Sequence, residues 1–217
     1  MIAKWGPPAA FVSAGSLSAF VVIGMAGDQI ALAFPALTIP RLVLVLFVAL
    51  WVWVLALGVV TRSMAAELAP WRWHLWFVVG RWAMLVAVAL PFVIAYATVT
   101  NSDPPGTIAI VFFATSLGVV LLIHNIAATG QGVFGTVVPM IGIVAALSFL
   151  SVAGLIMLTT GDIRGLSDSV ALIVAMVFYV GWAIWIGLRL LRARDLELDE
   201  AMIGPQGAEM AIGRTQR

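Results

Sequence analysis

Six long runs of apolar residues constrain the fold more than any other feature of this sequence. They cover residues 9–25, 42–60, 75–98, 107–123, 134–159 and 169–188. The chain has 11 Lys and Arg and 10 Asp and Glu, yet only Arg81 falls inside these runs. A helix needs about 20 apolar residues to cross a hydrocarbon core of about 30 Å. The runs therefore predict an all-α, polytopic transmembrane bundle with six spans.

The composition excludes most other classes of protein. The chain is 63% hydrophobic and 10% charged, whereas a soluble domain is about 45–50% apolar and about 25% charged. Disordered and nucleic-acid-binding proteins need more charge than this. The apolar runs do not alternate as the strands of an outer-membrane barrel do. With no cysteine, disulfides, thiolate catalysis and thiolate metal sites are also excluded.

The chain divides into a membrane domain over residues 1–191 and a cytoplasmic tail over residues 192–217. No Gly or Pro interrupts the tail before Gly204, so the last helix is predicted to continue to about Met202, with a flexible segment beyond. Basic residues come first in the tail and acidic residues follow, which suits lipid head groups and then water. The tail is either a docking helix for a soluble cytoplasmic partner or a solvated helix end.

Two segments near the N-terminus allow alternative interpretations. The first apolar run follows Lys4, as in a signal peptide, but Pro7–Pro8 and the length of the run favour a retained span. The apolar stretch Ile30–Ile39 is too short to span. It is predicted to be an interfacial or half-buried loop, the alternative being an extension of the first helix past Gly27.

The basic residues predict the orientation, because Lys and Arg accumulate on the cytoplasmic side. Six spans place both termini on one side, which then carries Lys4, Arg62, Arg72, Arg189, Arg192 and Arg194. Only Arg41 and Arg164 fall on the other side. The prediction is a multi-pass protein of the bacterial cytoplasmic (inner) membrane with both termini in the cytoplasm. Trp71, Trp73 and Trp76 mark an aromatic belt at the cytoplasmic boundary.

Arg81 is the first candidate site, because ionisable groups within a membrane are costly and commonly functional. It lies six residues beyond Leu75, roughly 9 Å inside the span, and no carboxylate in any span neutralises it. Two roles remain open: a structural side chain that snorkels to the head groups, or a ligand for an anionic head group or substrate. Pro91 in the same run removes the donor for the carbonyl near Ala87 and predicts a kink.

His74 and His124 are the only histidines, and the topology places both at the cytoplasmic rim of adjacent helices. A bis-histidine haem needs two such ligands, but the rim position favours interfacial hydrogen bonding. No other metal spacing, phosphate loop or nucleophile motif occurs. No catalytic residue, metal or cofactor is therefore predicted.

Small residues recur at four-residue spacing in three of the runs: Gly15 with Ala19, Ala114 with Gly118, and Gly142 with Ala146. Small residues let membrane helices approach closely. These pairs predict a compact bundle.

The stretch from Arg62 to Pro91 carries one family resemblance. A span is followed by a short cytoplasmic helix with Glu67-Leu68-Ala69-Pro70, and Gly80-Arg81 opens a long span that contains a proline. This layout resembles the coupling segment of six-helix ABC exporter permeases, although Met1–Pro8 is too short for that family's N-terminal amphipathic helix. The resemblance implies a permease that works with a separate ATPase.

The expected function is an integral membrane subunit of a transporter or larger membrane complex, without enzymatic activity of its own. The scarcity of polar groups inside the spans favours this class. The alternatives are the ABC-type permease and a lipid-modifying or lipid-binding enzyme. The expected partners are the lipid bilayer, other membrane subunits or a second copy, and a soluble cytoplasmic protein, but no nucleic acid. The candidates for docking a partner are Glu67, Arg72, Arg192 and Arg194.

Overall fold

The computed structural model describes residues 5–33, 39–68, 70–100, 103–132, 134–158 and 173–193. Its helices are α1 (Gly6–Ala33), α2 (Ile39–Glu67), α3 (Pro70–Thr100), α4 (Asp103–Gln131) and α5 (Val137–Leu158). A further helix, Ile173–Ala193, is called the sixth helix below. Six helices of the described chain are long and apolar enough to cross a membrane. The prediction of an all-helical chain with six candidate spans is confirmed.

The helices α1 to α4 begin earlier and end later than the apolar runs that predicted them. The loop predicted for Ile30–Ile39 is wrong at both ends, because α1 continues past Gly27 to Ala33 and α2 already begins at Ile39. Residues 34–38 lie outside the described chain. One glycine weakens a helix by only about 1 kcal/mol relative to alanine. An early end would leave backbone groups unpaired in an apolar environment, which costs more.

The connection between α4 and α5 uses two glycines with left-handed backbone conformation. Gly132 has a φ of 67° and its amide donates to the Ala128 carbonyl at 3.1 Å, which terminates α4. Gly135 has a φ of 73° and donates to the Gly132 carbonyl at 3.0 Å. Side chains with a Cβ rarely adopt such angles. The helix α4 thus ends at Gln131, eight residues beyond the predicted end of this span at residue 123.

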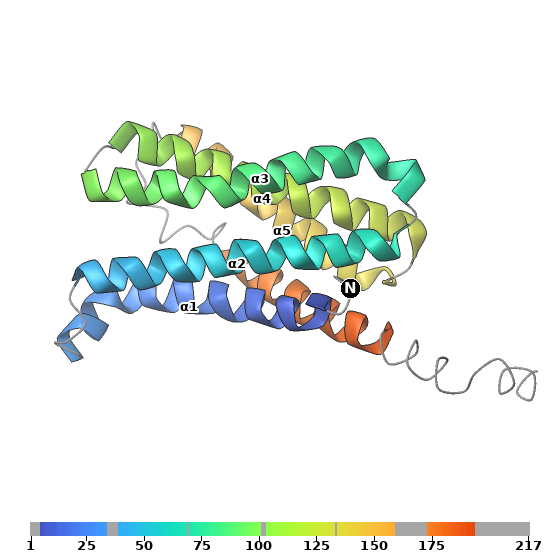
Figure 1. Cartoon of the computed structure of the whole chain (residues 1–217), viewed down its shortest axis with the longest axis horizontal. Helices are drawn as coiled ribbons and strands as arrows, with labels where there is room; N and C mark the ends of the chain where they lie inside the picture. Colours follow the sequence, from blue (N-terminus) through green and yellow to red (C-terminus); the bar gives the residue numbers. More distant parts are fainter. Residues whose placement is uncertain are drawn as a thin grey trace, which may run out of the picture.

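The helices alternate in direction, and α4 is the most enclosed of them. Figure 1 shows α1 beside α2 on one side of the bundle and α3 beside α4 on the other, and α5 packs along α4. Within the spanning segments, 56% of the residues of α4 are buried but only 22% of those of α3. The helix α3 is therefore the peripheral element of the described bundle.

One end of the bundle carries most of the described charged side chains. The starts of α1, α3 and α5 gather there with the ends of α2, α4 and the sixth helix, at the right of Figure 1. Exposed side chains at this end include Arg62, Glu67, His74, Arg189 and Arg192. We call it the basic end.

Small residues bring α4 and α5 into close contact. A Cβ on Gly118 would lie 2.7 Å from Leu150 Cγ and 3.0 Å from the Ala146 carbonyl oxygen. A Cβ on Gly142 would overlap the Asn125 side chain. The predicted role of Gly118 and Gly142 in helix contact is thus confirmed, whereas Gly15 faces open space.

Candidate functional site

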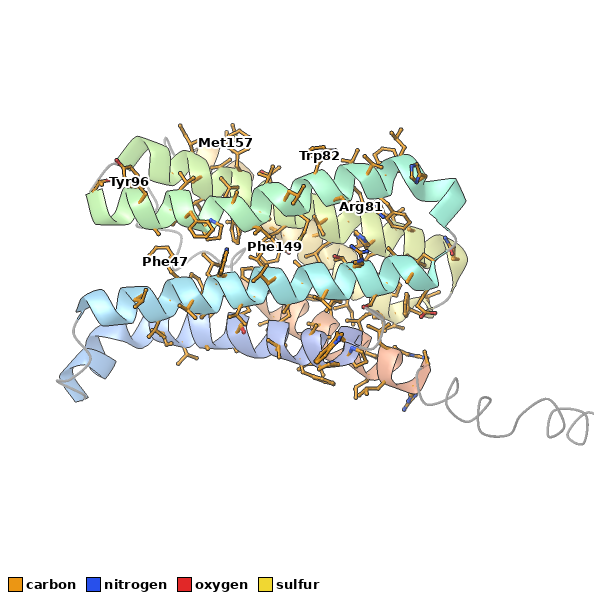
Figure 2. All side chains as sticks on the ribbon, viewed as in Figure 1. Phe47, Arg81, Trp82, Tyr96, Phe149 and Met157 are labelled. Atoms are coloured by element: carbon orange, nitrogen blue, oxygen red, sulfur yellow. The ribbon has the colours of Figure 1, made fainter. Side chains whose placement is uncertain are left out.

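The exposed guanidinium of Arg81 is the first feature of the candidate site. Arg81 projects from α3 toward α2 in Figure 2. Because α3 begins at Pro70, Arg81 lies about 16 Å from the start of the helix at 1.5 Å per residue. The only acidic side chain that the structure describes is Glu67, at the end of α2. No described carboxylate is therefore available at the level of Arg81.

Contacts at two levels join α2 to α3 along a line that we call the α2–α3 seam. A Cβ on Gly58 would lie 3.3 Å from Met84 Cε. Further from the basic end, Trp51 and Phe92 pack edge to face with ring centroids 5.0 Å apart. The Trp51 indole N–H also donates to the Val88 carbonyl at 3.2 Å.

The indole of Trp51 meets α3 in the helical turn that precedes Pro91. Proline has no N–H, so the Ala87 carbonyl loses its usual helical donor. The helix nevertheless continues without a break through Pro91. The Trp51 indole therefore donates to the Val88 carbonyl, which is next along the chain to the Ala87 carbonyl that lacks a helical donor.

His124 is buried within α4, which corrects the predicted position at the rim. The helix continues to Gln131, so His124 lies about two turns before its end. Its exposed fraction is 6%, its Nδ1 donates to the Val120 carbonyl at 2.8 Å, and its ring packs on Phe77 at 5.3 Å. The histidine is held by its own helix and by α3.

The two histidines do not form an opposed pair. A Cβ on Gly80 would lie 3.3 Å from His124 Cε1, so His124 is level with Gly80. His74 is exposed and lies six residues earlier on α3, about 9 Å along the helix axis. The geometry gives no common site for a haem between them.

The predicted docking candidates are only partly described. Glu67 and Arg192 are exposed at the basic end. The side chain of Arg72, and Arg194 as a whole, lie outside the described residues. The short cytoplasmic segment expected at Glu67-Leu68-Ala69-Pro70 is not a separate element, because α2 runs to Glu67 and α3 begins at Pro70. The polar residues after the apolar run simply continue α2.

Two buried polar contacts in the core were missed by the sequence analysis. Near the centre of the bundle, the Ser13 hydroxyl is hydrogen-bonded to the Tyr179 hydroxyl and also donates to the Trp53 carbonyl at 3.4 Å. Closer to the basic end, Trp182 Nε1 donates to Asn125 Oδ1 at 2.9 Å. These side chains are uncharged, so a search for ionisable groups passes over them. Ser13 inside an apolar run, and Asn125 two residues beyond the end of another, are the signal that could have found them.

Aromatic rings fill the space around these polar groups. The ring of Trp53 lies 5.9 Å from Phe113, 6.1 Å from Phe149 and 5.4 Å from Tyr179, between centroids. Tyr179 in turn packs on Trp182 at 5.6 Å. These rings come from α2, α4, α5 and the sixth helix, and Ser13 adds α1. We call this set the aromatic core.

Comparison with protein-family models, with curated proteins and with solved structures finds no match.

The described residues hold no catalytic constellation. They contain no group of three or more His, Cys, Asp or Glu side chains that could bind a metal ion. The hydroxyls of Ser13 and Tyr179 are bonded to each other inside the aromatic core. A hollow on the surface between α5 and the sixth helix is apolar, with Thr136, Val137, Met140, Ile141, Val144 and Phe178 around it. The hollow offers apolar contacts.

Proposed function

We propose that the protein is a non-enzymatic integral membrane subunit of a transporter or of a larger membrane complex. The aromatic core is the observation that carries this proposal. Trp53, Tyr179 and Trp182 are each buried at 2% exposure or less. They occupy the region where a substrate pathway through a single bundle would pass.

A pathway for a polar solute needs polar groups that are free to bind the solute, and most of those described in the aromatic core are bonded within the protein. Pores and transporters place charged side chains, carbonyls or other hydrogen-bonding groups where the cargo passes. Here the hydrogen-bonding capacity of Ser13, Tyr179 and Trp182 is used inside the core. A role that depends on stable packing beside other subunits fits this arrangement better than transport by the chain alone.

The peripheral helix α3 offers the surface for such a partner. Leu75 and Trp82 are exposed along it, with Trp82 at 66% exposure. Aromatic side chains are enriched in the interfaces of protein complexes and also at membrane boundaries. In a complex, this face of α3 would pack on a membrane helix of another subunit or of a second copy.

The proposal includes a location and an orientation. The protein would lie in the bacterial cytoplasmic membrane with the basic end inside, because Lys and Arg accumulate on the cytoplasmic side. Arg189 and Arg192 of the sixth helix would then face the cytoplasm together with Arg62. A soluble partner would meet the chain at this end.

The direct junction of α2 and α3 weakens the alternative of an ABC-type permease. The resemblance depended on a coupling segment between two spans, and α2 ends only three residues before α3 begins. An ATPase partner would need another docking element on this chain.

Purification from its native membrane in a mild detergent tests the proposed function. We expect a tagged full-length chain to retain a membrane partner in fixed stoichiometry through affinity and size-exclusion steps. The variant Trp82→Glu on the exposed face of α3 should lose that partner, whereas Arg192→Gln should keep it. If the chain purifies alone and moves solute across liposomes, the proposal is wrong.

A further inference from the structure

Arg62 and Arg81 lie at the same level on opposite sides of the α2–α3 seam. The contact between Gly58 and Met84 sets the register of the two antiparallel helices. Arg62 follows Gly58 by four residues and Arg81 precedes Met84 by three. Residues three and four apart share one face of a helix, so both arginines are one turn from the contact, in the direction of the basic end. Figure 2 shows the Arg81 side chain directed from α3 toward α2.

This pair of cations has no counter-charge in the described structure. Both arginines are exposed, and neither forms an ion pair with a described side chain. Glu67 lies five residues beyond Arg62, about 7.5 Å further along α2. Two guanidinium groups that face each other across a seam repel one another unless an anion lies between them. The planar guanidinium matches the oxygens of a phosphate group in two-point hydrogen bonds.

The surface next to the two arginines is apolar and has the length of one lipid leaflet. Leu55 and Leu85 are exposed along the seam on the side away from the basic end. The seam is closed by the Trp51–Phe92 pair. From Arg62 to Trp51 is about 16 Å along α2, roughly half of a hydrocarbon core of about 30 Å. An acyl chain attached to the phosphate would lie along this apolar stretch. A free phosphate ion has no acyl chain and would gain nothing from these side chains.

From this juxtaposition, we propose that Arg62 and Arg81 bind the phosphate head group of an anionic phospholipid at the α2–α3 seam. The phosphate lies between the two guanidinium groups, and an acyl chain packs on Leu55 and Leu85. The lipid neutralises Arg81 at a depth where no described carboxylate does so. This site is independent of the proposed function, because it needs no partner protein.

Lipid binding to the purified full-length protein tests the site. The protein in a neutral detergent is titrated with phosphatidylglycerol, with phosphatidylcholine and with inorganic phosphate, and bound lipid is read by native mass spectrometry. We expect binding of phosphatidylglycerol at least about 10-fold tighter than that of the other two. Arg62→Gln and Arg81→Gln should each weaken it by about 10-fold, the loss expected for one charged hydrogen-bonding partner.

Three controls decide the result. Arg192→Gln removes an exposed arginine of the sixth helix at the same end of the bundle and should leave lipid binding unchanged. Arg62→Lys and Arg81→Lys keep the charge, and each should retain more binding than the matching Gln variant. The Gln variants should elute as the wild type does in size exclusion, and a variant that does not is replaced by its Lys counterpart for the comparison.

Several outcomes would overturn the lipid site. An equal loss in Arg192→Gln would mean that only net charge matters. Equal binding of phosphatidylglycerol and phosphatidylcholine would remove the role of the anionic head group, and equal binding of inorganic phosphate would remove the role of the acyl chain. None of these results bears on the retention of a protein partner, so this inference and the proposed function are tested separately.

Discussion

At the scale of single residues, Asn125 connects three helices of the core. Its side chain lies against Gly142 of α5, where no Cβ intervenes. Its amide nitrogen donates to the Leu121 carbonyl at 2.7 Å, and its oxygen accepts from Trp182 of the sixth helix. In a bilayer, helix association depends on such close packing and hydrogen bonds, since lipid is as apolar as the core.

Replacing Gly142 by alanine should destabilise the bundle. The added Cβ would overlap the Asn125 side chain, so either the helices separate or Asn125 rotates and loses its bond to Trp182. Overpacking of this kind costs about 1–3 kcal/mol. We expect Gly142→Ala to lower the thermal unfolding midpoint in detergent, as measured by differential scanning fluorimetry. The matched control is Gly154→Ala on the same helix, where nothing lies within 4 Å of the added Cβ. Equal midpoints for the two variants would contradict this account.

At the scale of elements, α3 is held to α2 by few contacts, and Trp51 provides one of them. Its indole donates to the Val88 carbonyl and its ring packs on Phe92, on either side of Pro91. A helix that lacks one of its own hydrogen bonds depends more on such neighbours. The middle of α3 should therefore be less stable than α4 and should respond to changes at Trp51.

The variant Trp51→Phe should loosen α3 around Pro91 without affecting the core. Phenylalanine keeps a ring beside Phe92 but cannot donate to the Val88 carbonyl. We expect faster amide hydrogen exchange in peptides that cover residues 86–96 and no change in peptides of α4 and α5, as measured by mass spectrometry. Trp82→Phe is the control, because that ring is exposed on the same peripheral helix. Unchanged exchange at residues 86–96 would show that the hydrogen bond contributes nothing to α3.

The helices themselves were predictable from the sequence, but their ends and their contacts were not. Apolar length alone identifies a spanning helix, because the bilayer imposes that length. The helix α4 continues past the apolar run to Gln131, because the glycines that form the turn after it, Gly132 and Gly135, come only there. That continuation placed His124 inside the bundle. The Ser13–Tyr179 contact joins α1 to the sixth helix, and no local pattern predicts which face of one meets the other.

At the scale of the whole molecule, the candidate site also divides into predictable and unpredictable parts. Arg81 stood out from the sequence because it is the only charge in an apolar run. Arg62 did not, because its role as a neighbour of Arg81 follows from the register of α2 against α3. The predicted orientation depends instead on the distribution of Lys and Arg along the sequence, with six on one side of the six spans and two on the other.

The orientation can be tested directly, because the chain has no cysteine of its own. Single cysteines at Arg192→Cys and Thr100→Cys place one thiol at each end of the bundle, both at exposed positions. A membrane-impermeant maleimide added to intact cells should label Thr100→Cys and should label Arg192→Cys only after the membrane is permeabilised. The physical reason is that the end rich in arginine is retained on the cytoplasmic side during insertion. Labelling of Arg192→Cys in intact cells would show that the orientation is the reverse, and the proposed lipid site at Arg62 and Arg81 would then lie in the outer leaflet.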